Sequence, residues 1–506
     1  MKNFYYLTIL STLAAVQIHA QGTAASQPNV VFIYGDDLGR GMLSHYGQKL
    51  INTPNIDQLF QRGVSFENAY GCMFSAPSRA SMLTGYHDCH KDKWNITGGG
   101  KYKTVKNYED LEKLEDQLNK QFVELPQGDL LLPQVFKKAG YVTGQYGKLD
   151  WGFSATRQQI RQHGWDDYCG YMDHQQAHCF YPHFLIENDS LLFLEGNTHP
   201  TEGRGFESET PTNYAKRWDM RGKNIYSQDL FLERMLDFIR KHKDEKFFLY
   251  HSTQLSHGPV AVKKVHPLVK NRKDLTELEK EYATMVLMLD DHIGILLNEL
   301  KRLGLYENTI FIFSVDNGHE TYCTVGNRCR KAPNLDMEGR QFDAWNYPLT
   351  SERTGDYFDG NNGFSGKKWM NWEGGIRVPL VFTWPGHIPE GRTIQQTVAN
   401  YDLLPTFADL LNVELTYPKD GESLVPILLK NKKKLKKERY VYVSSYEGPA
   451  VIDSEHWKLR YNRAMKKYRL HYLPEDKKEE VILNDKYPKV FKRLKAKLDA
   501  VINSPK

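Results

Sequence analysis

Two pairs of oxygen-bearing side chains each follow an apolar run in this chain of 506 residues. Asp36 and Asp37 close the run NVVFIYGDD, and Asp316 and Asn317 close TIFIFSVDN. One Asp-Asp pair alone is usually a solvated turn or a helix cap. Two such pairs at strand ends can converge, because ligands gather beyond the carboxyl ends of parallel strands. Three carboxylates and one amide then suit a hard divalent cation, which takes several oxygen ligands.

The segment GCMFSAPSRASMLTG, at residues 71–85, combines four hydroxyl side chains, one cysteine and one arginine with little bulk. By itself it could be a Ser/Pro/Arg turn that caps a helix beginning at Pro77. Its SAPSR, which starts at Ser75, and its final TG also fit the pattern C/S-x-P-S-R-x4-T-G. In this pattern the chain resembles the formylglycine-dependent type I sulfatases of the alkaline-phosphatase-like superfamily, in the serine form that occurs among bacterial carbohydrate sulfatases.

The resemblance implies a catalytic role for Ser75. In this family the leading residue of the pattern is oxidised to formylglycine, whose aldehyde hydrate supplies the nucleophilic oxygen. A serine at this position implies that the anaerobic sulfatase-maturing enzyme is a partner during biosynthesis. Cys72 lies three positions earlier and is not expected to be the nucleophile. The resemblance also implies a bound calcium ion. Its ligands would be Asp36, Asp37, Asp316, Asn317 and the side-chain oxygen of Ser75.

A second block, GYVTGQYGKLDWG at residues 140–152, resembles the family motif G-Y-x-T-x-x-x-G-K-W-H-x-G. Lys148 then takes the role of the sulfate-binding lysine. Asp150 stands where the family usually has histidine, and a KLD variant occurs in some branches, including ones resembling arylsulfatase K. We therefore interpret Asp150 as the mark of a subfamily. Asp150 and His319 are the further candidates for contact with the substrate.

Three more residues take their roles from the resemblance. Arg79 is expected to bind sulfate and to steady the hydrate. His257, within QLSHGP, corresponds to the histidine that protonates the departing alcohol oxygen. Lys368 lies five residues before Glu373 in KKWMNWEGGIRVP and corresponds to another sulfate-binding lysine. Lys367 is a near-equal alternative for that role.

Strands that end in polar residues alternate with helices along the chain. The apolar runs at 29–37, 247–257 and 309–319 have the composition of buried strands. Residues 131–140 and 281–304 have helical spacing, and each segment ends in glycine. This alternation predicts an α/β fold with a mostly parallel sheet sandwiched by helices. The resemblance implies the same architecture, alkaline-phosphatase-like.

The chain divides into three predicted parts. Residues 1–20 have the basic start, short apolar run and small final residue of a signal peptide, which predicts an exported, periplasmic protein with no membrane span. Residues 21–435 are the predicted catalytic domain. Residues 436–506 are a predicted α+β subdomain, because RYVYVSSY and KLRYNR alternate like an antiparallel sheet and PKVFKRLKAKLDAVI has helical spacing.

Composition excludes some classes of protein. The formal net charge of +5 is mild and its basic residues are dispersed, so nucleic acid is not expected as a partner. The six cysteines lack CxxC spacing, which argues against a zinc site of that kind. Cys323 with Cys329, or Cys169 with Cys179, could form disulfides, and free thiols are equally compatible.

These residues together predict hydrolysis of a sulfate ester on a carbohydrate. A phosphodiesterase or phosphonate monoester hydrolase of the same superfamily is one alternative, and a non-catalytic exported glycan-binding protein is the other. Residues 87–127, 150–221 and 321–366 are expected to be loops over the strand ends, with aromatic and polar side chains that suit a sugar ring. Long loops tend to close a pocket, which predicts exo action at the end of a sulfated glycan.

Overall fold

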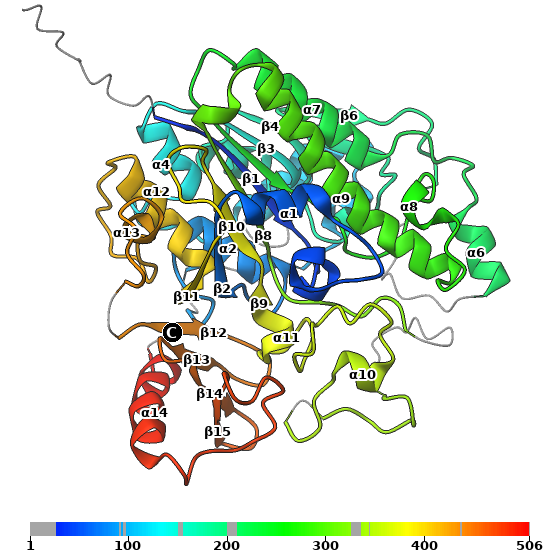
Figure 1. Cartoon of the computed structure of the whole chain (residues 1–506). Helices are drawn as coiled ribbons and strands as arrows, with labels where there is room; N and C mark the ends of the chain where they lie inside the picture. The colour runs from blue at the N-terminus through cyan, green and yellow to red at the C-terminus, as the bar shows by residue number, and fades with distance from the viewer. Residues whose placement is uncertain are drawn as a thin grey trace, which may run out of the picture.

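A large α/β body carries a smaller sheet and a final helix at one end (Figure 1). The computed structural model describes residues 27–90, 93–94, 98–149, 155–199, 210–324, 335–343, 345–435 and 438–504. The predicted signal peptide and the candidate residue Asp150 lie outside these ranges. The predicted fold class is confirmed, since a mostly parallel main sheet is joined by an antiparallel C-terminal sheet.

Eleven strands of the described residues form the main sheet. They are β1 (Asn29–Gly35), β2 (Val64–Tyr70), β3 (Val142–Lys148), β4 (Asp167–Tyr171), β5 (Phe184–Glu187), β6 (Ser190–Phe193), β7 (Phe247–Ser252), β8 (Thr309–Val315), β9 (Arg377–Val378), β10 (Leu380–Thr383) and β11 (Arg392–Ala399). Their order is β11-β2-β10-β8-β1-β7-β3-β4-β5-β6, with β9 beside β2. Because β8, β1, β7 and β3 are parallel neighbours, their carboxyl ends meet along one edge.

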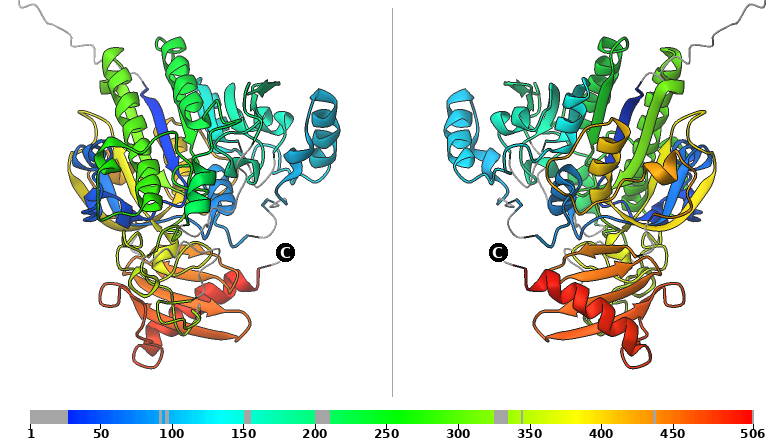
Figure 2. Two further views of the ribbon diagram at one scale, coloured as in Figure 1. Left: turned by 90° about the vertical axis from the view of Figure 1, so that its right-hand side faces the viewer. Right: turned by 90° about the vertical axis from the view of Figure 1, so that its left-hand side faces the viewer.

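Helices cover both faces of the main sheet (Figure 2). One layer contains α1 (Pro54–Gln61), α7 (Ser227–Lys241) and α9 (Glu277–Arg302), and the other contains α2 (Ser75–Thr84), α4 (Leu132–Lys138) and α12 (Leu403–Leu410). Successive side chains of a strand point to opposite faces. Accordingly, Phe247 packs against Phe238 of α7, whereas Phe248 stacks on Phe136 of α4. The apolar core lies on both sides of the central strands.

The small, polar segment that carries the sulfatase pattern forms α2, and every residue of this helix is buried. Its side chains are small enough for close packing, and its hydroxyls find internal partners, as when Ser81 Oγ donates to Tyr86 O at 2.5 Å. The helix begins at Ser75, two residues before Pro77. It ends at Gly85, whose φ of 75° is the left-handed conformation that favours glycine. Ser75 therefore lies in the first turn of a fully buried helix.

The stretch at residues 150–221 is not simply a loop, so that part of the prediction is wrong. β4, β5 and β6 lie within it and extend the main sheet. These strands are too short to show a clear alternation, but Asn188 and Asp189 join β5 to β6 as a tight hairpin turn. Asn188 has a φ of 52°, which Asn tolerates in such turns.

The remaining α-helices of the catalytic part have 4 to 12 residues. They are α3 (Tyr108–Asn119), α5 (Arg157–Gln162), α6 (Pro211–Arg217), α8 (Pro267–Lys270), α10 (Ser351–Thr354), α11 (Glu373–Ile376) and α13 (Val425–Leu428). Within the ranges that the structure describes, none of the helices has both the length and the apolar composition that a membrane crossing requires. Cys169 on β4 is a free thiol, so it forms no disulfide with Cys179. Cys329 lies outside the described residues.

The C-terminal unit consists of a four-stranded antiparallel sheet and one helix. Its elements are β12 (Tyr440–Val443), β13 (Ala450–Asp453), β14 (Trp457–Asn462), β15 (Lys467–Tyr472) and α14 (Pro488–Ile502). Leu494 and Leu498 of α14 are fully buried against the sheet residues Leu459 and Leu470. The predicted domain boundary at residue 436 stays a prediction.

A buried lysine joins the C-terminal sheet to the catalytic part. Lys458 on β14 is fully buried, and its Nζ lies 2.9 Å from Glu373 Oε1 on α11 and 2.9 Å from Glu479 Oε1. Removing one partner of a buried ion pair leaves uncompensated charge, which costs far more than the loss of a surface pair. This cluster therefore fixes how the two sheets are held together.

We expect Lys458→Met to lower the free energy of unfolding by about 3–5 kcal/mol, because Glu373 and Glu479 would lose their shared cation. The matched control is Lys495→Met, which removes a partly exposed pair with Asp499 on α14. The control should cost less than about 1 kcal/mol. Urea unfolding of the two variants measures both values, and equal, small losses would contradict the role of Lys458.

Candidate functional site

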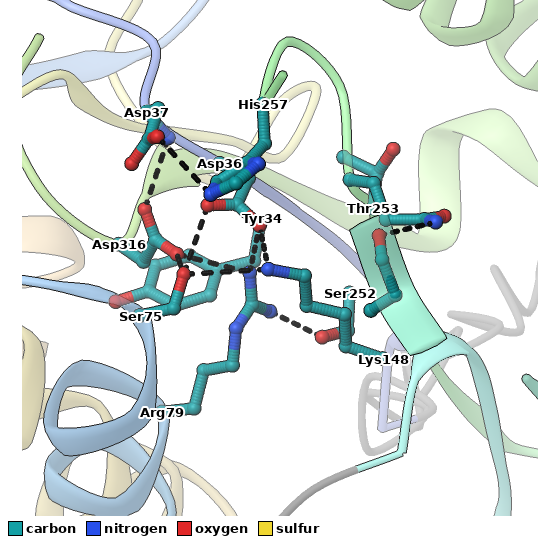
Figure 3. Close-up of polar contacts among 12 residues, drawn as sticks. Tyr34, Asp36, Asp37, Ser75, Arg79, Lys148, Ser252, Thr253, His257 and Asp316 are labelled. Atoms are coloured by element: carbon teal, nitrogen blue, oxygen red, sulfur yellow. Dashed lines mark hydrogen bonds and ion pairs between the residues drawn. The ribbon is translucent and has the colours of Figure 1, made fainter. Parts of the chain in front are cut away.

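The central parallel strands bring most of the predicted site residues to one place (Figure 3). Asp36 and Asp37 follow β1, and Asp316 and Asn317 follow β8. Lys148 is the last residue of β3, and the loop after β7 carries His257. The first turn of α2 adds Ser75 beside them, and the start of its second turn adds Arg79. Each of these eight side chains is buried.

Ser75 Oγ lies between two carboxylates and an ammonium group. It is 2.8 Å from Asp36 Oδ1, 2.5 Å from Asp316 Oδ2 and 3.4 Å from Lys148 Nζ. A hydroxyl group has a single proton, so it can donate to only one of the two carboxylates. Burial and the charge of Asp36 raise the pKa of Asp316 to about 7. The two carboxylates therefore require a proton or a cation between them.

Three cations face the carboxylates, namely Arg79, Lys148 and Lys368. Arg79 Nη2 is 3.1 Å from Asp316 Oδ2 and 3.5 Å from Asp36 Oδ2, and its Nη1 donates to Ser252 Oγ. Lys148 Nζ forms an ion pair with Asp36 Oδ2. Burial acts to raise the pKa of Asp36, but the nearby positive charges, Lys148 first, outweigh it and hold that pKa well below its usual range.

The two candidate lysines before Glu373 have different ion-pair partners. Lys368 Nζ lies 2.9 Å from Asp37 Oδ2, so this ammonium group belongs to the cluster. Lys367 Nζ instead pairs with Glu320 Oε1 at 2.8 Å. Both lysines are buried, yet only Lys368 contacts a predicted metal ligand.

The oxygen atoms of the cluster fit a calcium ion. Asp36, Asp37, Asp316 and Asn317 have fully buried side chains that bring three carboxylates and one amide together. Among the described residues, the buried Asn317 Oδ1 has no hydrogen-bond partner, while its Nδ2 donates to Asp37 Oδ1 at 2.8 Å. An amide oxygen without a donor beside crowded carboxylates is the environment that a hard cation completes.

His257 borders the same cluster on the side away from Arg79. Its Nδ1 donates to Gly258 O at 2.5 Å, and its Nε2 is 3.4 Å from Asp37 Oδ2. Burial, followed by the charge of Lys368, lowers the pKa of His257 well below its usual value. The ring of His178 stacks on it with 4.3 Å between centroids. Since Nδ1 holds its own proton on a carbonyl, Nε2 is the atom left to exchange a proton.

One candidate substrate residue lies apart from the cluster. His319 is 1 % exposed, and its Nε2 is 3.5 Å from Asp356 Oδ2. Its ring packs against Gly360, where an added Cβ atom would meet ring atoms at 2.3 Å, and its own Cβ packs against Gly39. His319 therefore packs within the segment that contains Asp356 and Gly360, and its contact with substrate stays a prediction. Asp150, the other candidate, lies outside the described residues.

Sequence reasoning missed three neighbours of the site. Ser252 ends β7 and accepts from Arg79, and Tyr322 donates its hydroxyl proton to Asp37 Oδ2 at 2.5 Å. His178 lies within residues 150–221, a stretch expected only to offer aromatic and polar side chains to a sugar ring. For Ser252, the polar end of FFLYHS at a central strand was an available signal. Tyr322 lies in an irregular segment and His178 ends the short 3-10 helix Gln176–His178, and for neither does the sequence have such a signal.

Two family models match nearly the whole chain. The family model described as Sulfatase matches residues 28–413, and the model of the N-sulphoglucosamine sulphohydrolase C-terminal region matches residues 360–504. An N-acetylgalactosamine-6-O-sulfatase of Bacteroides thetaiotaomicron is 25% identical over 95% of this chain and 94% of its own length. An N-acetylgalactosamine-6-sulfatase of Rattus norvegicus is 27% identical over 83% of this chain and 69% of its own length.

Solved structures share the fold. The structure of BT4656 in complex with its substrate D-glucosamine-2-N,6-O-disulfate has a TM-score of 0.60 and 19% sequence identity, and covers 94% of this chain and 97% of its own. The family match and the fold together confirm the resemblance drawn from the sequence patterns. The chain therefore belongs to the sulfatase family, as a type I sulfatase of the alkaline-phosphatase-like superfamily that hydrolyses sulfuric esters.

Proposed function

We propose that this protein is an exported, calcium-dependent sulfatase that removes sulfate from the end of a sulfated glycan through a formylglycine at position 75. The observation that carries this proposal is the position of Ser75 Oγ, which lies within 3.4 Å of Lys148 Nζ and of two carboxylates. A side chain that becomes a nucleophile needs such a set of charged partners. The apolar start of the chain supports export.

The charge of the pocket supports an anionic substrate. Three carboxylates face Arg79, Lys148 and Lys368, so the cluster by itself is near neutrality. A divalent cation on the carboxylates would leave the pocket positive and able to hold a sulfate group. The first turn of α2 adds backbone N–H groups whose dipoles favour an anion. These preorganised charges would stabilise the negative charge that develops as the S–O bond breaks.

The chain's own residues divide the remaining work. A bound calcium ion would neutralise charge at the sulfate oxygens, and an oxidised residue 75 would supply a nucleophilic hydroxyl group. Arg79 and Lys148 orient that side chain and the sulfate together. His257 holds a proton at Nε2 for the departing alcohol oxygen, since Gly258 O fixes its Nδ1–H. A bound sulfate ester brings negative charge to His257, which favours its protonated form.

A carbohydrate is the substrate that the relatives suggest. Two of them are named for 6-sulfated N-acetylgalactosamine, and we extend only the broader class, a sulfated sugar, to this chain. Ser75 and Lys148 are only 7 % and 3 % exposed, from which we infer that the reacting group enters a largely enclosed pocket. Such a pocket admits a chain end more easily than the interior of a polymer, which supports exo action.

We expect Ser75→Ala to lower kcat/KM by about a thousandfold or more, because the side chain that becomes the nucleophile is gone. The assay is release of sulfate from 2-, 3-, 4- and 6-sulfated hexoses and hexosamines after expression with a sulfatase-maturing enzyme. The matched control is Cys72→Ala, which removes the nearby buried cysteine and should retain activity. The mass of the peptide containing residue 75 reports whether Ser75 has lost two hydrogens.

Comparable turnover by purified Ser75→Ala would refute the mechanism. Faster cleavage of phosphonate or phosphate diesters than of sulfate esters would favour the phosphonate hydrolase alternative. Binding of sulfated sugars with no turnover, despite a converted residue 75, would favour the glycan-binding alternative.

Lys368→Met should lower kcat/KM by about a hundredfold or more. The substitution removes a preorganised positive charge that would stabilise the negative charge developing on the sulfate group in the transition state. Lys367→Met should leave kcat/KM within about threefold and instead lower the melting temperature, because it strands Glu320 as an unpaired buried carboxylate. Steady-state kinetics and thermal unfolding of both variants make the comparison. The reverse pattern would show that Lys367 is the sulfate-binding lysine.

A further inference from the structure

Three aromatic rings cluster beside the reactive group, and two of them, Trp369 and Tyr446, are exposed. The centroid of Trp369 lies 4.7 Å from that of Phe74 and 5.9 Å from that of Tyr446. The ring of Tyr446 is inclined by only 17° to Trp369 and by 20° to Phe74. We call Trp369 and Tyr446 the aromatic platform, with Phe74 as its inner support.

The platform adjoins the residues that hold the sulfate group. Phe74 directly precedes Ser75, and Trp369 directly follows Lys368. The same ammonium group, Lys368 Nζ, lies 2.9 Å from Asp37 Oδ2 and 5.2 Å from the centre of the Trp369 ring. A ligand whose anionic group contacts Lys368 would therefore lie close to this ring.

Both rings of the platform are open to solvent. Tyr446 is 66% exposed and Trp369 is 38% exposed, whereas Ser75 and Lys368 are 7% and 5% exposed. The exposed apolar surface thus begins where the charged pocket ends. Adjoining large aromatic rings that stay exposed to solvent on a protein surface indicate a binding site.

The backbone holds the platform in a fixed and strained position. Trp369 has a φ of 81°, which side chains other than glycine rarely adopt and which tends to persist at functional sites. Its N–H donates to Met73 O at 2.7 Å, next to Phe74, and so secures it. Tyr446 lies in the turn between β12 and β13, where Ser445 Oγ donates to Gly448 O at 2.7 Å.

We propose that the aromatic platform is the site on which a pyranose ring of the substrate stacks while its sulfate group occupies the charged pocket. The C–H face of a pyranose is apolar, and its weakly positive hydrogens suit the negative face of an aromatic ring. The continuity of the platform with Lys368 selects a sugar that carries a sulfate group over an unrelated protein partner. This inference rests on the proposed function and names the substrate surface of the same site.

The C-terminal unit gains a role in recognition from this proposal. Tyr446 belongs to the C-terminal unit, in the turn between β12 and β13, whereas Trp369 and Phe74 belong to the catalytic part. The hydrogen bond from Asn371 Nδ2 to Gly448 O, at 2.9 Å, ties the two segments of the platform together. Substrate binding therefore depends on both parts of the chain.

The test uses the full-length, matured enzyme and the best substrate from the panel of sulfated hexoses and hexosamines, prepared as methyl glycosides. Tyr446→Ala should lower kcat/KM by about tenfold, mainly through a higher KM, because one stacking ring is lost. Tyr446→Phe keeps the ring and should match the wild type. Trp369→Gly removes the second ring, tolerates the left-handed backbone and should have the same effect as Tyr446→Ala.

The matched control is Tyr214→Ala, which removes a similarly exposed ring on α6. It should leave kcat and KM unchanged. If Tyr446→Ala and Tyr214→Ala both lie within about twofold of the wild type, below the effect of one lost stacking ring, the platform does not bind the sugar. A loss in Tyr446→Phe as large as in Tyr446→Ala would assign the effect to the hydroxyl group and overturn the stacking proposal.

A binding measurement separates this inference from the proposed function. Calorimetric titration of the same glycosides into Ser75→Ala protein, with and without Tyr446→Ala, requires no turnover. Weaker binding in the double variant supports the platform even if the wild type hydrolyses none of the sugars, a result that would refute only the proposed function. Equal binding in both proteins refutes the platform, whatever the wild type hydrolyses.

Discussion

The structure depends on a buried group of three carboxylates and three cations at the carboxyl ends of β1, β8 and β3. Charges removed from water are costly unless each has a close partner of opposite sign. Here Arg79 pairs with Asp316, Lys148 with Asp36 and Lys368 with Asp37. Such a group persists only if the strands keep their register and if α2 begins at the right place. The parallel order β8-β1-β7-β3 meets the first condition, and the small side chains of α2 meet the second.

The segment that leads into α11 connects this group to the rest of the molecule. Lys368 pairs with Asp37, Trp369 lies on the surface beside it, and Glu373 receives Lys458 from the C-terminal sheet. Within six residues the chain thus contributes to the charged pocket, to the surface beside the pocket and to the contact between the two sheets. A distortion of the C-terminal sheet would therefore reach the pocket through a short and well-packed path.

Much of the architecture could be predicted because local signals agreed with the final packing. The apolar runs at 29–37 and 309–319 contain the buried strands β1 and β8. Gly304, which closes the predicted helix at 281–304, follows the end of α9. Long sequence patterns also led to Ser75, Lys148 and His257 before any geometry was known. The order of strands, which brings these residues together, came only from the structure.

The rest depended on tertiary contacts that sequence patterns do not encode. Lys367 and Lys368 are neighbours in irregular backbone, so only the direction of each side chain separates their roles. β5 and β6 are four residues each, too short for a clear alternation, and β13 and β15 were likewise not identified. Tyr322, in a loop, and His178, at the end of a short 3-10 helix, reach the site through tertiary folding that ordinary residue types do not reveal.

The measurement that tests the central claim most directly is thermal unfolding with calcium, magnesium or zinc added to metal-stripped protein. A cation bound only by the folded state at a hundredfold excess over its Kd adds about 2.7 kcal/mol to stability. The account predicts that calcium raises the melting temperature by this mechanism, more than magnesium or zinc does, and that Asn317→Ala reduces the shift by removing one oxygen ligand. No shift with calcium, or a larger shift with zinc that Asn317→Ala leaves intact, would contradict it.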